Sequence, residues 1–141
     1  MNAIARNGPM SLASPTLRAW HARFVEALCA RDANAYLAFL ASDCTIAINN
    51  ALPSYAKAAI ERVYGEYLAL FRTLTVEVLT VHGDETSLAV EGLLNYVLKD
   101  GSTEIVQCAW FLSRDDGGLI TAVRVYGNAS RVFRPFIPTA N

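Results

Sequence analysis

The chain has 141 residues, of which 53% are hydrophobic and 18% charged, and its formal net charge at pH 7 is −1. One domain of this length buries a substantial core, and the near-neutral charge without a Lys/Arg run argues against nucleic-acid binding. No apolar stretch reaches the roughly 20 residues that span a bilayer, and residues 1–10 lack the apolar region of a secretory signal. The many hydrophobic residues must be covered, so we expect an internal pocket and a subunit interface.

The cysteines and histidines argue against a metal site. Cys29, Cys44 and Cys108 are an odd number in no metal-ligand spacing, and the chain has only two histidines. Free thiols of this kind are typical of a reducing compartment. We therefore expect a cytoplasmic protein with no metal and no cofactor.

The first half of the chain predicts an arm followed by three helices. Residues 1–14 are small and polar and predict a mobile N-terminal arm. Ser14 and Pro15 are typical of a helix start, and apolar residues follow at helical spacing. A shorter helix is expected from Asp32, and a third over about residues 55–72.

The second half predicts four long strands. A short strand over 43–48 precedes the third helix, and Val- and Thr-rich runs follow over 74–82, 86–99, 103–114 and 119–128, separated by Gly- and Asp-containing turns. Prolines exclude a central strand over 134–141, which we expect to be a tail. Helices followed by a strand meander predict an α+β domain over 15–133, with three helices on the concave face of a curved antiparallel sheet.

The predicted strands are apolar on both faces. Leu88, Val90 and Leu94 alternate with Ala89 and Leu93, whereas a sheet with one solvated face alternates apolar and polar residues. We expect helices on the concave face and a second copy of the chain on the outer face. This pattern predicts a homodimer.

Three stretches resemble the nuclear-transport-factor-2-like superfamily: residues 24–32, 40–46 and 120–128. That superfamily includes SnoaL-like polyketide cyclases, ketosteroid isomerase and limonene epoxide hydrolase. The resemblance covers about residues 15–133 and implies a cystatin-like cone with a hydrophobic pocket. It is poor evidence of one activity, because this fold hosts many chemistries.

The residues of ketosteroid isomerase are not retained. The resemblance places Phe24 where that enzyme has a tyrosine, and Trp110 and Ile48 where it has aspartates. Of these three side chains only the indole of Trp110 has a proton to donate, and none can accept one as a base.

The chain also lacks most of the catalytic residues of limonene epoxide hydrolase. Its Asp–Arg–Asp trio would fall at Asn95, Leu93 and Val125, and its water-holding Tyr and Asn at Ala47 and Asn49. An asparagine cannot deprotonate a water molecule. The two best-known activities of the superfamily are therefore not expected.

The same comparison nominates site residues on the inner wall of the cone, where residues 91, 93 and 95 share one face of their strand. The expected ligand-binding residues are Phe24, Tyr64, Leu93, Cys108, Trp110 and Val125. The candidate catalytic residues are Asn95, Asn49 and Glu91. Each has a structural alternative: a satisfied buried amide for Asn95, a turn cap for Asn49, and an ion pair with Arg124 for Glu91.

Two further aromatic positions are open to two interpretations. His21 is either a partly exposed helix residue or approaches the pocket from the helix that carries Phe24. Trp110 is either a core residue or a platform that stacks on a ring-shaped ligand.

Three functions fit the sequence. The first is a cyclase or isomerase of secondary metabolism that acts on an apolar polycyclic, terpenoid or polyketide substrate by shaping it and excluding water. The second is a non-catalytic binder of an apolar ligand. The third is a protein-interaction module of the nuclear-transport type, whose pocket would be filled by its own side chains.

Overall fold

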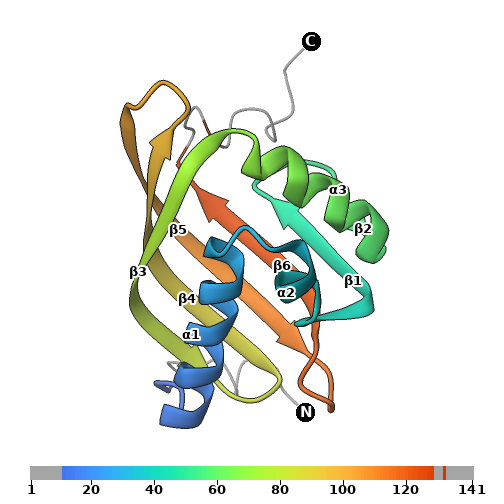
Figure 1. Ribbon diagram of the computed structural model, residues 1–141. Helices are drawn as coiled ribbons and strands as arrows, with labels where there is room; N and C mark the ends of the chain where they lie inside the picture. The colour runs from blue at the N-terminus through green and yellow to red at the C-terminus, as the bar shows by residue number, and fades with distance from the viewer. Residues whose placement is uncertain (1–10, 129–131, 133–141) are drawn as a thin grey trace.

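The computed structural model describes residues 11–128 and Val132 (Figure 1). The helices are α1 (Pro15–Cys29), α2 (Ala33–Leu37) and α3 (Ala56–Leu68). The strands are β1 (Leu40–Ile48), β2 (Ser54–Tyr55), β3 (Phe71–Gly83), β4 (Ser87–Leu98), β5 (Thr103–Arg114) and β6 (Ile120–Gly127). The predicted C-terminal tail and residues 1–10 of the predicted arm lie outside the described residues.

The strands form one curved sheet in the order β2-β1-β6-β5-β4-β3. The long strands β3 to β6 pair antiparallel, as predicted, whereas β1 pairs parallel to β6. The sheet is therefore mixed. The helices lie across its concave face, which confirms the α+β class (Figure 1).

Capping side chains begin the first two helices. The Ser14 hydroxyl accepts a hydrogen bond from the Leu17 N–H at 3.2 Å, and Pro15 occupies the first turn. The Asp32 carboxylate accepts from the backbone N–H groups of Asn34 and Ala35 at the start of α2. These caps place both helix starts at the residues that the sequence predicts.

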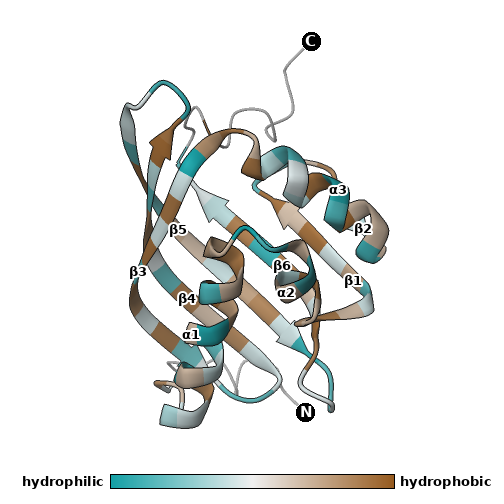
Figure 2. Ribbon diagram, in the orientation of Figure 1, coloured by the Kyte–Doolittle hydropathy of each residue, from teal (hydrophilic) through white to brown (hydrophobic). Residues whose placement is uncertain are grey.

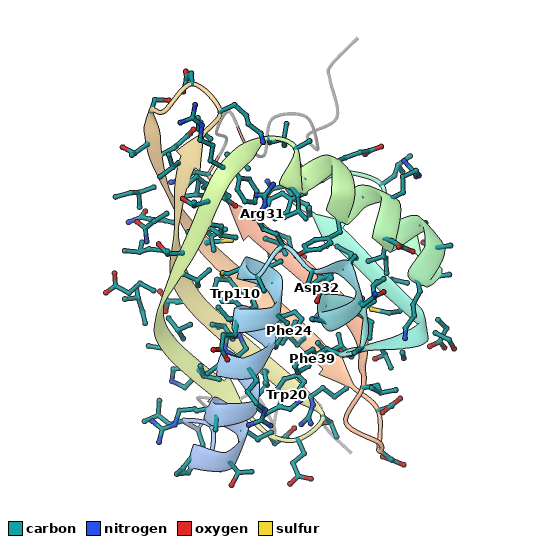
Figure 3. All side chains as sticks on the ribbon, viewed as in Figure 1. Trp20, Phe24, Arg31, Asp32, Phe39 and Trp110 are labelled. Atoms are coloured by element: carbon teal, nitrogen blue, oxygen red, sulfur yellow. The ribbon has the colours of Figure 1, made fainter. Side chains whose placement is uncertain are left out.

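Arg31 ties the helices to the edge of the sheet. It lies between α1 and α2 with a positive φ of 61°. Its guanidinium donates to the carbonyls of Leu68, Phe71 and Arg72, at 3.0, 3.2 and 3.3 Å. One side chain thus joins the α1–α2 corner to the connection between α3 and β3 (Figure 3).

Strand β3 also pairs with the chain ahead of α1. The Ala13 N–H donates to the Val81 carbonyl, and the Gly83 N–H donates to the Ser11 carbonyl, both at 2.9 Å. The arm predicted over residues 1–14 is therefore attached to the sheet from Ser11 onward.

Strand register sets which residues enter the core. Gly92 lies opposite Cys108 on the buried face, and Leu93 lies opposite Gln107 on the outer face. Hydrophobic residues run along the strands behind the helices, and hydrophilic residues gather at many of the turns (Figure 2). No helix in the described part of the chain is long and apolar enough to cross a membrane.

Candidate functional site

An apolar cavity of about 100 Å³ lies between the helices and the sheet. All three helices line it, through Phe24, Val25, Leu28, Tyr36, Ile60, Val63, Tyr64 and Tyr67. The sheet contributes Ile46, Ile48, Val76, Leu94, Cys108, Trp110, Val123 and Val125. None of these lining residues is an acid, a base or a histidine.

Phe24 joins the cavity to an aromatic cluster at the lower end of α1. Its ring stacks on Trp20 at 6.2 Å between centroids and meets Phe39 edge-on at 5.6 Å. Phe24 also packs against Tyr36, with the centroids 5.7 Å apart. These rings come from α1, α2 and the segment that follows α2, and Figure 3 shows Trp20, Phe24 and Phe39 grouped beside the lower half of α1.

Trp110 and His21 form a buried hydrogen-bonded pair beside the cavity. The Trp110 indole N–H donates to His21 Nε2 at 2.9 Å, and the two rings stack with centroids 5.8 Å apart. His21 is 1% exposed, so the expectation of a partly exposed histidine is wrong. Burial lowers the pKa of His21 to about 4, which keeps the imidazole neutral and able to accept this bond.

Two of the tyrosines on the cavity wall also have hydrogen-bond partners. The Tyr64 hydroxyl donates to the Leu28 carbonyl at 2.8 Å. The Tyr67 hydroxyl lies 2.5 Å from the Tyr96 hydroxyl. Burial raises the pKa of Tyr64 to about 12, so its hydroxyl stays protonated near neutral pH.

Tyr36 differs from these neighbours. Its ring stacks on that of Tyr64, with the centroids 4.6 Å apart, and its side chain is 5% exposed. Its hydroxyl makes no hydrogen bond within the described part of the chain. Burial raises the pKa of Tyr36 well above its ordinary value, so the group is a hydrogen-bond donor.

Five of the six predicted ligand-binding residues line the cavity: Phe24, Tyr64, Cys108, Trp110 and Val125. The sixth, Leu93, does not. It lies on the outer face of β4, where it borders a shallow hollow with Glu91.

The placement of Glu91, Leu93 and Asn95 inside the cone is therefore a wrong prediction. Residues 91, 93 and 95 do share a face, but β4 pairs with β5 so that Glu91 meets Ala109 and Asn95 meets Ile105 on the outer face. The side chains of β4 alternate between the two faces of the sheet as predicted. The phase of that alternation is wrong by one residue, so each side chain lies on the face opposite to the predicted one.

Glu91 also lacks the ion pair proposed as its alternative role. The Arg124 guanidinium lies over the Phe111 ring, 5.7 Å from the centroid. Within residues 11–128, the ion pair that forms is Arg62 with Glu66 on the surface of α3.

Asn49 has a structural position at the end of β1. Its side-chain oxygen accepts from the Gly127 N–H at 3.0 Å, and its own N–H donates to the Val125 carbonyl at 2.7 Å. Its φ of 50° lies in the left-handed region that asparagine tolerates. These contacts support the turn-capping alternative, and Asn49 does not line the cavity.

Sequence reasoning missed Tyr36 as a site residue. The short helix predicted from Asp32 contains Tyr36, but a helix prediction does not tell which hydroxyl lacks a partner. In the described part of the chain no three His, Cys, Asp or Glu side chains lie close enough together to hold a metal ion.

An α+β cone whose helices enclose an apolar cavity defines a protein of the nuclear-transport-factor-2-like superfamily. Within it, the SnoaL-like domain family matches residues 21–123, and the chain belongs to that family. A search of curated proteins found no match.

Solved structures share this fold. RV0760c from Mycobacterium tuberculosis, in complex with estradiol-17beta-hemisuccinate, is 25% identical with a TM-score of 0.69, covering 82% of this chain and 95% of that one. A delta 5-3-ketosteroid isomerase from Mycobacterium sp. is 24% identical with a TM-score of 0.68, covering 79% and 92%. A putative SnoaL-like polyketide cyclase from Jannaschia sp. CCS1 is 13% identical with a TM-score of 0.72, covering 89% and 97%.

Proposed function

We propose that the chain binds an apolar small molecule in the cavity between its helices and sheet. The observation that carries this proposal is the lining of that cavity, which is aliphatic and aromatic with only a few polar groups. Ligand sites are commonly of this kind, because apolar walls provide affinity and a few polar groups provide orientation. A relative of similar fold holds a steroid derivative, and another, from Catenulispora acidiphila, holds trimethylamine.

The size of the cavity limits what enters it. Engineered apolar cavities of about 150 Å³ take up benzene. A volume of about 100 Å³ therefore suits one small ring or a branched alkyl group. A terpenoid or polyketide substrate would bury one such part and leave its other rings at the mouth of the cone.

A cyclase or isomerase is our first candidate activity for this site. The wall offers hydroxyls with raised pKa values and no carboxylate, so catalysis would rest on folding the substrate and excluding water. The absence of a base among the described lining residues equally favours the second candidate, a non-catalytic binder. The open cavity argues against a protein-interaction module filled by its own side chains.

Thermal unfolding tests the proposal. The full chain is heated alone and with an excess of benzene, limonene or a monocyclic ketone. A ligand at 100 times its dissociation constant raises the unfolding free energy by about 2.7 kcal/mol, because it binds only the folded state. A rise in Tm with at least one compound is expected, and no rise with any of them would contradict the proposal.

Dimerisation through the outer face of the sheet forms part of the proposal. Leu79, Ile105 and Tyr126 are 52%, 64% and 48% exposed there, and Leu93 and Phe111 lie among them half-buried. An apolar face of this extent favours a protein interface. A cytoplasmic location likewise stays a prediction.

A further inference from the structure

Tyr36 carries an unsatisfied hydrogen-bond donor in the wall of the cavity. The side chain is 5% exposed and makes no hydrogen bond within residues 11–128. The hydroxyl oxygen is nevertheless not sealed, since it is not among the described side-chain atoms that are fully buried without a hydrogen bond. Tyr36 lies deep in the molecule and lines the cavity.

The other polar groups on the wall are already engaged. The Tyr64 hydroxyl donates to a backbone carbonyl, the Tyr67 hydroxyl pairs with Tyr96, and the Trp110 N–H donates to His21. Buried donors in proteins are nearly always satisfied, and an exception requires an explanation. Among the described lining tyrosines, Tyr36 is the one whose hydroxyl remains available to a ligand.

We infer that the ligand presents a single hydrogen-bond acceptor, such as a carbonyl or ether oxygen or a ring nitrogen, to the Tyr36 hydroxyl while its apolar body fills the cavity. This inference rests on the proposed function and names the ligand class: an apolar ring with one acceptor. Stacking on Tyr64 fixes the Tyr36 ring, so the position of the acceptor is fixed as well. Apolar molecules without an acceptor would enter but leave the hydroxyl unpaired.

Benzene and pyridine test the inference, because they have nearly the same shape and differ by one acceptor nitrogen. Their dissociation constants are measured by calorimetry on the full chain and on Tyr36→Phe, at a mildly alkaline pH where pyridine is uncharged. Removing the hydroxyl should raise the dissociation constant of pyridine about five- to tenfold, because the loss of one hydrogen bond changes an affinity by about this factor. Benzene binding should be unchanged or tighter.

Tyr64→Phe is the matched control. Its hydroxyl is already bound to the Leu28 carbonyl, so its loss should change benzene and pyridine binding by the same factor. The two variants should also differ in stability. Tyr64→Phe leaves a carbonyl unpaired and should lower the Tm by several degrees, whereas Tyr36→Phe should leave it unchanged or raise it.

Three outcomes are distinguishable. A loss of pyridine affinity confined to Tyr36→Phe supports the inference. If both probes bind the wild-type chain and Tyr36→Phe changes them equally, the role of Tyr36 is overturned while the cavity remains a ligand site. If neither probe binds the wild-type chain, this inference fails, and the proposed function fails as well when none of the compounds in the thermal test raises the Tm.

Discussion

At the scale of single residues, the buried hydrogen bond beside the cavity depends on a neutral histidine. The His21 ring accepts the Trp110 N–H, and a protonated imidazole could not do so because both of its nitrogens would be donors. The sequence placed Trp110 correctly on the inner wall, but its partner lies 89 positions earlier in the chain. Such a pair depends on tertiary packing, which helical spacing around His21 does not contain.

This pair predicts an acid-sensitive stability. The pKa of His21 is about 4 in the folded chain, whereas a histidine in an unfolded chain has its ordinary pKa of 6.5, so the unfolded state binds the proton more readily. His21 contributes fully to the unfolding free energy above about pH 6.5. About 3 kcal/mol of that free energy is lost as the pH falls toward 4. Denaturant unfolding measured over this range checks the prediction.

His21→Gln is the control for that experiment. The Gln side chain can accept the Trp110 N–H but has no proton to gain in this range. Its unfolding free energy should depend less steeply on pH than that of the wild type. Equal slopes for the two proteins would show that His21 does not titrate as proposed.

At the scale of elements, Gly92 allows β4 and β5 to fit around the tryptophan. A Cβ atom at this position would lie 2.6 Å from Trp110 Cη2 and 2.9 Å from the Glu77 carbonyl oxygen. The alternation of β4 was predictable from its apolar residues, but both faces are apolar, so the sequence did not indicate which face is inside. The burial of Gly92 opposite Cys108 shows which phase the strand adopts.

Two glycine substitutions of opposite expected sign test this packing. Gly92→Ala should lower the unfolding free energy by about 1–3 kcal/mol, because the added methyl group displaces Trp110 and meets a backbone oxygen that cannot easily move. Gly65→Ala lies in α3, where a Cβ meets nothing within 4 Å, and it should raise stability by about 0.5–1 kcal/mol. Chemical denaturation of both variants measures the difference. An unchanged unfolding free energy for Gly92→Ala would show that a Cβ at this position does not displace Trp110.

At the scale of the whole molecule, the sequence predicted the class of fold because helix caps and strand alternation are local signals. It could not predict the mixed sheet, since the parallel pairing of β1 with β6 joins segments that are far apart in the chain. The apolar outer face, which the sequence also predicted, is the basis for the proposed dimer.

Ile105→Glu tests that dimer. The side chain is 64% exposed on the outer face, so a charge there should oppose association without disturbing the fold. Sedimentation should show the mass of a dimer for the wild type and of a monomer for the variant. Leu52→Glu, at a 91% exposed position after β1, should keep the wild-type mass. A monomeric wild type would refute the interface.

Benzene binding to a chain whose cavity has been filled tests the proposed ligand site. Val125→Phe adds a ring at a residue that lines the cavity, and Val97→Phe makes the same change on the outer side of β4 as a control. Calorimetry should detect benzene binding to the wild type and to Val97→Phe, and none to Val125→Phe. Equal binding by all three proteins would show that the ligand site lies elsewhere.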